Sequence, residues 1–354
     1  MATSQRARWI SYSLIFLLLS FIIFLTTGCI SSSNPGYSSV LTSISDQVKT
    51  EESIEAIKTS QEDENHDIVE IPITPTVSIA LETTEESLEI DEPLIDNLFI
   101  ETFGFPIPET GSRQIESSYR FGSTLFGERI PHDGVEILNP SGTPVLAVAD
   151  GIVYFSGDDS TKKWGRFTNF YGNFIIIKHQ IPGISDAIFT LYAHLSELLV
   201  TEDETVTQGQ TIGLVGATGK AFTNHLHFEV RVVDVHLQNA RNPELYLPLL
   251  PSEEQPEVGI LIGSLISSKG VPIPGVTVVI QKVIDGKQQP GPSIYVETYA
   301  KGISGDGNWN ENFVVSNLPV GEYRVSAFAY QHLVEEFIKI EANEFIFVTL
   351  QPEE

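Results

Sequence analysis

The chain has 354 residues, enough for two modest domains with tails. Asp and Glu outnumber Lys and Arg by 47 to 20, which gives a formal net charge of −27. Phosphate backbones repel such a surface, so the charge argues against nucleic acid as a partner. Cys29 is the single cysteine, which excludes an internal disulfide and a thiolate metal cluster. Any metal site must therefore use histidines and carboxylates.

Residues 1–28 are predicted to be a signal peptide or a membrane anchor. Arg6 and Arg8 precede the apolar stretch "SLIFLLLSFIIFLTTGC", and a positive end before an apolar run is typical of export signals. Cys29 resembles the lipidated cysteine of a bacterial lipoprotein signal, although Leu25 stands four residues before it rather than the usual three. An uncleaved helix is the alternative, because about 20 apolar residues can span a bilayer. Both interpretations place the rest of the chain outside the cytoplasm and attached to a membrane.

The composition then changes twice along the chain. Residues 29–100 are predicted to be an acidic flexible tether, because residues 30–100 hold 16 acidic residues and two lysines without a sustained apolar period. Residues 101–250 show short runs such as "TPVLAVA", "GIVYFSG" and "NFIIIKH" between turn residues, which predicts a globular β domain. A similar pattern over residues 258–354 predicts a small β-sandwich. The expected fold class is all-β after an N-terminal apolar helix.

Histidines and one glutamate form three clusters in the first β domain. His225 and His227 are two apart in "HLHFEV", so on a strand both imidazoles share one face. His132 and Glu136 are four apart, and His194 follows the run "TLYA". Each cluster alone is a weak signal, since isolated histidines are more often structural than metal-binding.

The order and spacing of these clusters over about 130 residues resemble the lysostaphin/LytM-type zinc endopeptidases, which cleave peptide bonds in bacterial cell walls. That family shows H-x-x-x-D, then a histidine in Y-x-H-L, then H-x-H. The corresponding segments here are "HDGVE", "YAHL" and "HLH", and the segments "GTPVLAVADGIVYFSG", "VTQGQTIGLVGATGKAFTNHLHFEV" and "RNPELYL" agree as well. The resemblance implies a LytM-type β-sheet or barrel-sandwich peptidase domain.

The resemblance also implies a role for each residue. His132, Glu136 and His227 would hold one Zn²⁺. His194 and His225 would be catalytic, one helping to deprotonate water and the other stabilising the tetrahedral intermediate or donating a proton; which does which stays open. The family uses Asp where this chain has Glu136. Two His and one Glu is a known catalytic zinc set, but the extra methylene moves the carboxylate by about a bond length and leaves turnover open.

The C-terminal segments "GSLISSKGVPIPGVTVVI" and "GISGDGNWNENFVVSNLPVGEYRVSAFAYQHL" resemble the carboxypeptidase regulatory-like family, a transthyretin-like β-sandwich. The resemblance implies a fold and says little about function. A spacer or a weak wall- or protein-binding module is expected, and purely structural support is an equal alternative to binding.

The predicted function is a membrane-tethered zinc metalloendopeptidase that hydrolyses stem peptides or cross-links of peptidoglycan. The alternative is a catalytically weak or inactive LytM-like protein that binds the wall or activates another hydrolase. A third interpretation, weaker, is an adhesion protein led by the C-terminal sandwich. Trp164 or Phe167, in the long hairpin of residues 158–170, is expected to contact substrate.

Overall fold

The computed structural model describes residues 103–284, 286–289 and 291–353. Cys29, the signal or anchor segment and the acidic tether lie outside the described residues, so these assignments stay predictions. Within the described ranges, no helix is long and apolar enough to cross a membrane. The helices of those ranges are the short 3₁₀ turns η1 (Leu237–Asn239) and η2 (Pro243–Leu245), and the remaining elements are strands. The predicted all-β fold class is confirmed.

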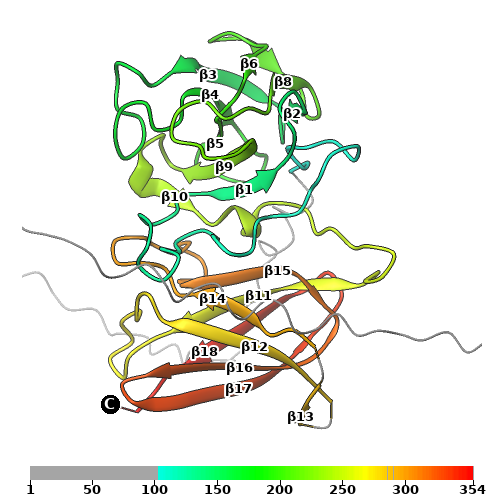
Figure 1. The fold of residues 1–354 in the computed structure, drawn as a ribbon, viewed down its shortest axis with the longest axis vertical. Coiled ribbons are helices and arrows are strands. Elements are labelled where there is room, and N and C mark those ends of the chain that lie inside the picture. Colours follow the sequence, from blue (N-terminus) through cyan, green and yellow to red (C-terminus); the bar gives the residue numbers. More distant parts are fainter. Residues whose placement is uncertain (1–102, 285, 290, 354) are drawn as a thin grey trace, which may run out of the picture. The chain divides into compact units, whose positions relative to one another are not determined.

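The first half of the described chain forms two sheets. Its strands are β1 (Val135–Leu138), β2 (Pro144–Leu146), β3 (Gly151–Asp158), β4 (Asn173–His179), β5 (Ile188–Ala193), β6 (Glu197–Leu198), β7 (Thr205–Val206), β8 (Thr211–Leu214), β9 (His225–Val232) and β10 (Ala240–Arg241). A seven-stranded sheet has the order β1-β9-β5-β4-β3-β7, with β10 beside β9, and a three-stranded sheet has the order β2-β8-β6 (Figure 1). Strand β9 therefore lies between β1 and β5 in the interior of the larger sheet.

Side-chain alternation gives the larger sheet two different faces. On β9, Leu226, Phe228 and Val230 belong to the main hydrophobic core. Successive side chains of a strand point to opposite faces, so the histidines of β9 lie on the other face. That second face also carries a smaller apolar cluster that includes Phe174 and Leu191. The alternation in "HLHFEVRV" thus separates a packing face from a polar face.

The C-terminal strands form a sandwich of two further sheets. They are β11 (Val258–Leu265), β12 (Thr277–Ile284), β13 (Lys287–Gln288), β14 (Ile294–Glu297), β15 (Phe313–Pro319), β16 (Gly321–Ala329), β17 (His332–Ile340) and β18 (Phe345–Leu350). One sheet has the order β15-β11-β18, with β11 and β18 parallel; the other has the order β13-β12-β16-β17, with β14 beside β12. The inner faces of these strands enclose a second hydrophobic core.

The main core crosses from the first set of strands into the C-terminal strands. Ile260, Ile262 and Val314 belong to the same buried cluster as Leu245 and Tyr246. The predicted domain boundaries stay predictions, but removing residues 258–354 would expose this apolar surface to water.

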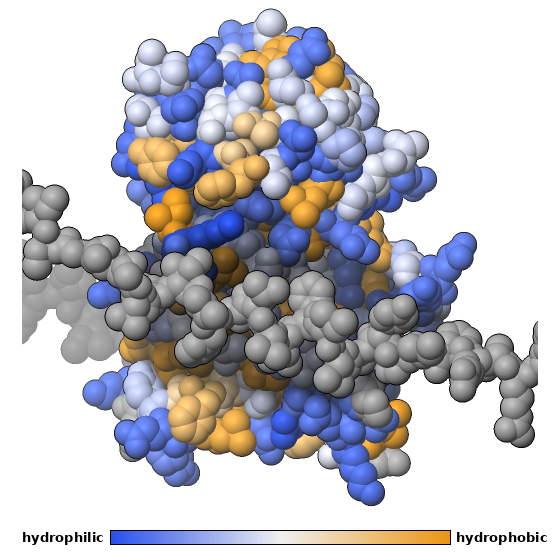
Figure 2. Space-filling view, in the orientation of Figure 1, coloured by the Kyte–Doolittle hydropathy of each residue, from blue (hydrophilic) through white to orange (hydrophobic). Residues whose placement is uncertain are grey.

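On the face shown in Figure 2, hydrophobic and hydrophilic residues are interspersed.

Candidate metal centre and active site

Strand pairing places the glutamate of the "HDGVE" segment opposite the second histidine of "HLH". Strands β1 and β9 are antiparallel, and Glu136 is the direct partner of His227. Val135 and Ile137 enter the main core, so Glu136 lies on the polar face together with His227. Directly opposed side chains on one face have Cβ atoms about 4.5–5.5 Å apart. The register of two strands therefore brings these two side chains together.

A close approach of the chain to β9 brings in His132. Gly134 lies two residues after His132 and directly before β1. A Cβ on Gly134 would lie 2.3 Å from the carbonyl oxygen of Phe228. Only glycine allows the backbone to lie this close to β9. The turn through Gly134 directs the His132 side chain back over the face that carries Glu136 and His227.

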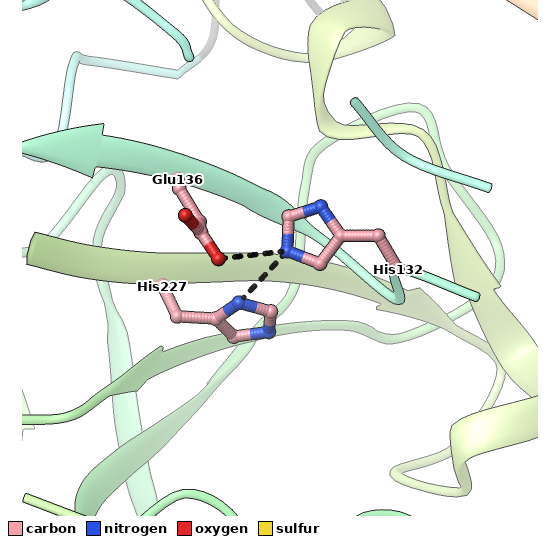
Figure 3. A group of neighbouring side chains, drawn as sticks. All are labelled: His132, Glu136 and His227. Atoms are coloured by element: carbon pink, nitrogen blue, oxygen red, sulfur yellow. Dashed lines mark hydrogen bonds and ion pairs between the residues drawn. The ribbon is translucent and has the colours of Figure 1, made fainter. Parts of the chain in front are cut away.

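The three side chains converge on one point (Figure 3). His132 Nε2 lies 3.2 Å from His227 Nδ1 and 3.8 Å from a Glu136 carboxylate oxygen. One ligand atom from each of the three residues lies within 4.8 Å of the others. The structure thus brings together the three residues that the family resemblance implies as metal ligands.

The protonation of these imidazoles favours a cation between them. His132 Nδ1 is 2.7 Å from the carbonyl oxygen of Tyr119, which can only accept, so Nδ1 carries the hydrogen. His227 Nε2 is 3.0 Å from the carboxylate of Glu229 and donates to it in the same way. In the neutral rings the two inward nitrogens are therefore bare lone pairs 3.2 Å apart beside a carboxylate. Such lone pairs repel each other unless a proton or a metal ion lies between them, so the donor set fits a metal.

Two further histidines line the same site. The ring centroids of His194 and His225 are 4.8 Å apart, and His194 is 5.6 Å from His227. His194 Nδ1 donates to the Thr218 carbonyl at 2.8 Å, and His225 Nδ1 donates to the Thr223 carbonyl at 2.9 Å. Both rings therefore keep the lone pair on Nε2.

The two histidines are held in unusual environments. His225 Nε2 is buried without a hydrogen-bond partner among the described residues, and it lies 3.8 Å from the Glu136 carboxylate. His194 has a left-handed backbone with φ of 65°, a conformation that costs a non-glycine residue energy and that clusters at functional sites. The fold therefore leaves His225 Nε2 available to a ligand.

Burial lowers the pKa of His132, His194 and His225 and so favours their neutral form. Desolvation lowers the pKa of His132 well below its usual value of 6.5, and the neighbouring His227 lowers it further. The same two causes, with His225, lower the pKa of His194 to about 3. Burial also lowers the pKa of His225, against the attraction of Glu136. Neutral imidazole is the form that binds metals and accepts protons.

A buried network behind His227 fixes its ring. The Glu229 carboxylate accepts from His227 Nε2, from the Tyr171 hydroxyl at 2.6 Å and from Arg231 Nε at 2.8 Å. Burial acts to raise the pKa of Glu229, but Arg231 and these donors hold that pKa at about 2. An ionised carboxylate that orients a ligand histidine is a common outer partner of protein metal sites.

Sequence reasoning overlooked this network, although a signal was present. Glu229 and Arg231 continue the two-residue alternation of His225 and His227 in an otherwise apolar strand. Charged side chains in a fully buried strand must be paired. Tyr171, which completes the network, carried no comparable signal.

The hairpin of residues 158–170 joins the site through a partly buried ion pair. Arg166 donates to both carboxylate oxygens of Asp133, at 2.6 and 2.8 Å. Burial and the nearby Glu229 raise the pKa of Asp133 to about 6, against the effect of Arg166. Asp133 thus faces Arg166, outside the group formed by His132, Glu136 and His227.

Three other side chains that the sequence analysis considered lie outside the group of five site residues. Trp164 packs against Phe155 and Phe174, with ring centroids 4.6 and 5.7 Å apart, whereas Phe167 is exposed. His179 is buried, and its two ring nitrogens bond to the Asp150 carbonyl and the Thr190 hydroxyl.

The remaining positions lie away from the site. His236 and His332 are exposed. A cavity of about 710 Å³ in the C-terminal sandwich is lined by neither histidine nor cysteine. Among the described residues, the one group of side chains that could hold a metal ion is therefore that of His132, Glu136 and His227.

Comparison with known proteins agrees with this site. The model of "Peptidase family M23" matches residues 130–242. The chain is 38% identical over 119 residues to "Peptidoglycan DD-endopeptidase ShyC" of Vibrio cholerae, a match that covers 34% of this chain and 24% of that protein. It is 33% identical over 182 residues to "Murein hydrolase activator NlpD" of Salmonella dublin, covering 51% of this chain and 39% of the relative.

Among solved structures, the catalytic domain of lysostaphin from Staphylococcus simulans is 29% identical, with a TM-score of 0.30, and the match covers 36% of this chain and 89% of that one. The matched part spans well under half the length of ShyC and of NlpD. The family match contains His132, Glu136, His194, His225 and His227. Residues 130–242 are therefore a domain of peptidase family M23.

Proposed function

We propose that this protein is a zinc endopeptidase that hydrolyses peptide bonds of bacterial peptidoglycan from a membrane-tethered position outside the cytoplasm. The observation that carries the proposal is the convergence of His132, Glu136 and His227 beside two further neutral histidines. The names of ShyC and of lysostaphin, an endopeptidase and a peptidase, support this reaction class. The tether rests on the sequence of residues 1–100 alone.

His132, Glu136 and His227 would hold the ion through Nε2, a carboxylate oxygen and Nδ1. When bound, Zn²⁺ would polarise the scissile carbonyl and lower the pKa of a bound water from 15.7 to about 7. Three protein ligands leave the position open that a catalytic zinc site requires.

His225 is the residue that we assign as proton acceptor. Its Nε2 has no other partner among the described residues, and the Glu136 carboxylate 3.8 Å away would stabilise the ring once it is protonated. His194 presents a second lone pair from the adjoining loop, because its Nδ1 is committed to Thr218. Two such histidines orient one water and carry its proton towards the leaving amine.

A second candidate function is wall binding or hydrolase activation without turnover. It is favoured by Glu136, which stands where the related pattern has Asp, and by the similarity to NlpD, whose name is that of an activator. Both functions use the same face of β9, and they differ in whether the site turns over.

The decisive experiment incubates the full chain with purified cross-linked peptidoglycan and follows new amino groups. We expect release that a chelator stops and that added Zn²⁺ restores. His225→Ala should abolish release, whereas His236→Ala, an exposed histidine of the same domain, should not change it. Activity that appears only in Glu136→Asp would favour the second function. No release by either form, with intact zinc binding, would overturn the endopeptidase proposal.

A further inference from the structure

His132 belongs to a loop of residues 119–132 that closes on itself; we call it the His132 loop. Both backbone groups of His132 form hydrogen bonds within the loop. Its N–H donates to the Ser123 carbonyl at 3.0 Å, and its carbonyl accepts from the Gly122 N–H at 2.8 Å. The Tyr119 ring stacks on the His132 imidazole at 4.2 Å and 7°. The position of this imidazole is therefore set by the shape of the loop, because no strand carries it.

The His132 loop contains strained backbone. Leu125 and Phe126 have φ of 52° and 57°. Bulky residues in the left-handed region are strained and persist only where the surroundings hold them. Hydrogen bonds within the loop supply part of this support, and contacts from outside the loop supply the rest.

Those contacts come from a buried carboxylate of the C-terminal sandwich. Glu297, at the end of β14, accepts from the Ser123 hydroxyl, from both the amide and the hydroxyl of Thr124, at 3.1 and 3.2 Å, and from the Phe126 amide at 3.1 Å. Its exposed fraction is 6%. A single carboxylate of the second module thus binds three residues of the His132 loop, and one of them, Phe126, is strained.

A neighbouring aromatic side chain completes the attachment. The Tyr299 ring meets Phe121 edge-on at 5.0 Å, and the Ala300 amide donates to Gly122 O at 2.9 Å. A Cβ on Gly122, whose φ is 76°, would lie 2.4 Å from the Tyr299 ring. The backbone that hydrogen-bonds to His132 therefore lies directly on the sandwich.

A second buried carboxylate holds the start of the loop. Glu244 binds Arg120 at 2.6 Å and also accepts from the amide and hydroxyl of Ser316, a residue of β15, at 2.9 and 2.7 Å. Arg120 directly follows Tyr119, whose carbonyl fixes the tautomer of His132. The start and the middle of the loop are therefore held by the C-terminal strands, directly or through Glu244.

We propose that the C-terminal sandwich positions the metal site, and that Glu297 is the positioning residue that holds the His132 loop so that His132 Nε2 faces Glu136 and His227. The inference rests on the proposed metal-dependent function for its consequence, and it gives the second module a role beyond that of a spacer. Glu297 touches no reacting atom and acts through His132.

The test compares Glu297→Gln with two control variants in the full chain. One Glu297 oxygen accepts from the Ser123 hydroxyl and from the amides of Thr124 and Phe126, and the other accepts from the Thr124 hydroxyl. Glutamine keeps the shape but has no charge and one acceptor oxygen, so these bonds lose their charge assistance and the Thr124 hydroxyl loses its acceptor. Glu335→Gln changes an exposed carboxylate of β17, and Val348→Ala weakens the sandwich core. Zn²⁺ affinity is measured by competition with a chelating dye, unfolding by temperature in chelator, and amide exchange over residues 119–132 in metal-free protein.

We expect Glu297→Gln to bind Zn²⁺ more weakly, by at most the roughly 10- to 100-fold that the loss of a direct partner of a ligand histidine costs, with faster exchange at residues 123–132. Ser123→Ala should act in the same direction and more mildly, and it serves if Glu297→Gln does not fold. Val348→Ala should lower the unfolding midpoint without changing Zn²⁺ affinity.

Unchanged exchange and affinity in Glu297→Gln, or an equal loss of affinity in Val348→Ala at matched stability, would overturn the positioning role. A wild-type protein that binds no Zn²⁺ would instead contradict the proposed function. In that case the amide exchange of metal-free protein still decides whether Glu297 holds the His132 loop.

Discussion

Replacing Glu229 by glutamine separates the orientation of a ligand histidine from the stability of the fold. The wild-type carboxylate accepts from three donors, on His227, Tyr171 and Arg231. Glutamine has nearly the same shape, but it has one acceptor oxygen, an amide donor and no charge. At least one donor therefore loses its partner, and the His227 ring is no longer held by an anion.

The structure predicts two effects of different size. Arg231 is buried, and removing one partner of a buried ion pair destabilises a protein by about 3–5 kcal/mol. The loss of the anion behind His227 should weaken metal binding by roughly 10- to 100-fold. The second effect requires His227 to be a ligand, whereas the first does not.

The assay measures the free energy of unfolding of metal-free protein and the Zn²⁺ affinity by chelator competition. The double variant Glu229→Gln/Arg231→Met removes the unpaired buried charge, so we expect it to recover part of the lost stability while its affinity stays low. A Glu229→Gln protein that is folded and binds Zn²⁺ as tightly as wild type would refute the reasoning. Recovery of affinity together with stability in the double variant would do the same.

Three further outcomes are expected. Gly134→Ala should destabilise the protein and weaken metal binding, because its new Cβ would lie 2.3 Å from the Phe228 carbonyl oxygen; a fold and an affinity like those of wild type would contradict this. Burial lowers the pKa of His179 to about 4, so the unfolded chain binds more protons and stability falls as pH drops from about 6.5 to 4, by at most about 1.4 kcal/mol per pH unit from this residue. His179→Gln should therefore flatten the pH dependence of chemical unfolding, and an unchanged slope would exclude His179 as its source. Phe167→Ala should weaken binding to isolated cell walls with unchanged stability, whereas Trp164→Ala should lower the unfolding midpoint. Equal wall binding by Phe167→Ala and wild type would contradict the expected contact between Phe167 and substrate.

A short sequence pattern was sufficient to predict features that depend only on neighbouring residues, such as a strand and the faces of its side chains. The alternation in "HLHFEVRV" predicted a strand with both histidines on one face, and the structure has β9 with Leu226 and Phe228 in the main core. Strand periodicity follows from backbone geometry alone, so a single segment reveals it. The turn residues between apolar runs likewise predicted an all-β chain.

The spacing of one histidine and one glutamate does not identify a metal site, because it occurs twice in the chain. His66 and Glu70 have the same spacing as His132 and Glu136, and spacing cannot distinguish them. His132 is placed at the site by its contact with His227, 95 residues away, and Glu136 by the register that sets it opposite that histidine. Neither relation follows from a local pattern, because pairing depends on the path of the chain between the strands.

The sequence by itself determined the types of ligand available, the all-β class and the polar face of one strand, since these depend on composition and on a two-residue period. Only the tertiary structure decided that Asp133 binds Arg166 rather than the metal group, that Glu229 orients His227, and that Glu297 binds the His132 loop from 174 residues away at Ser123. Each of these is a long-range contact of a buried charge. A buried charge must find a partner wherever the fold brings one within reach, and that partner is fixed by packing rather than by neighbouring residues.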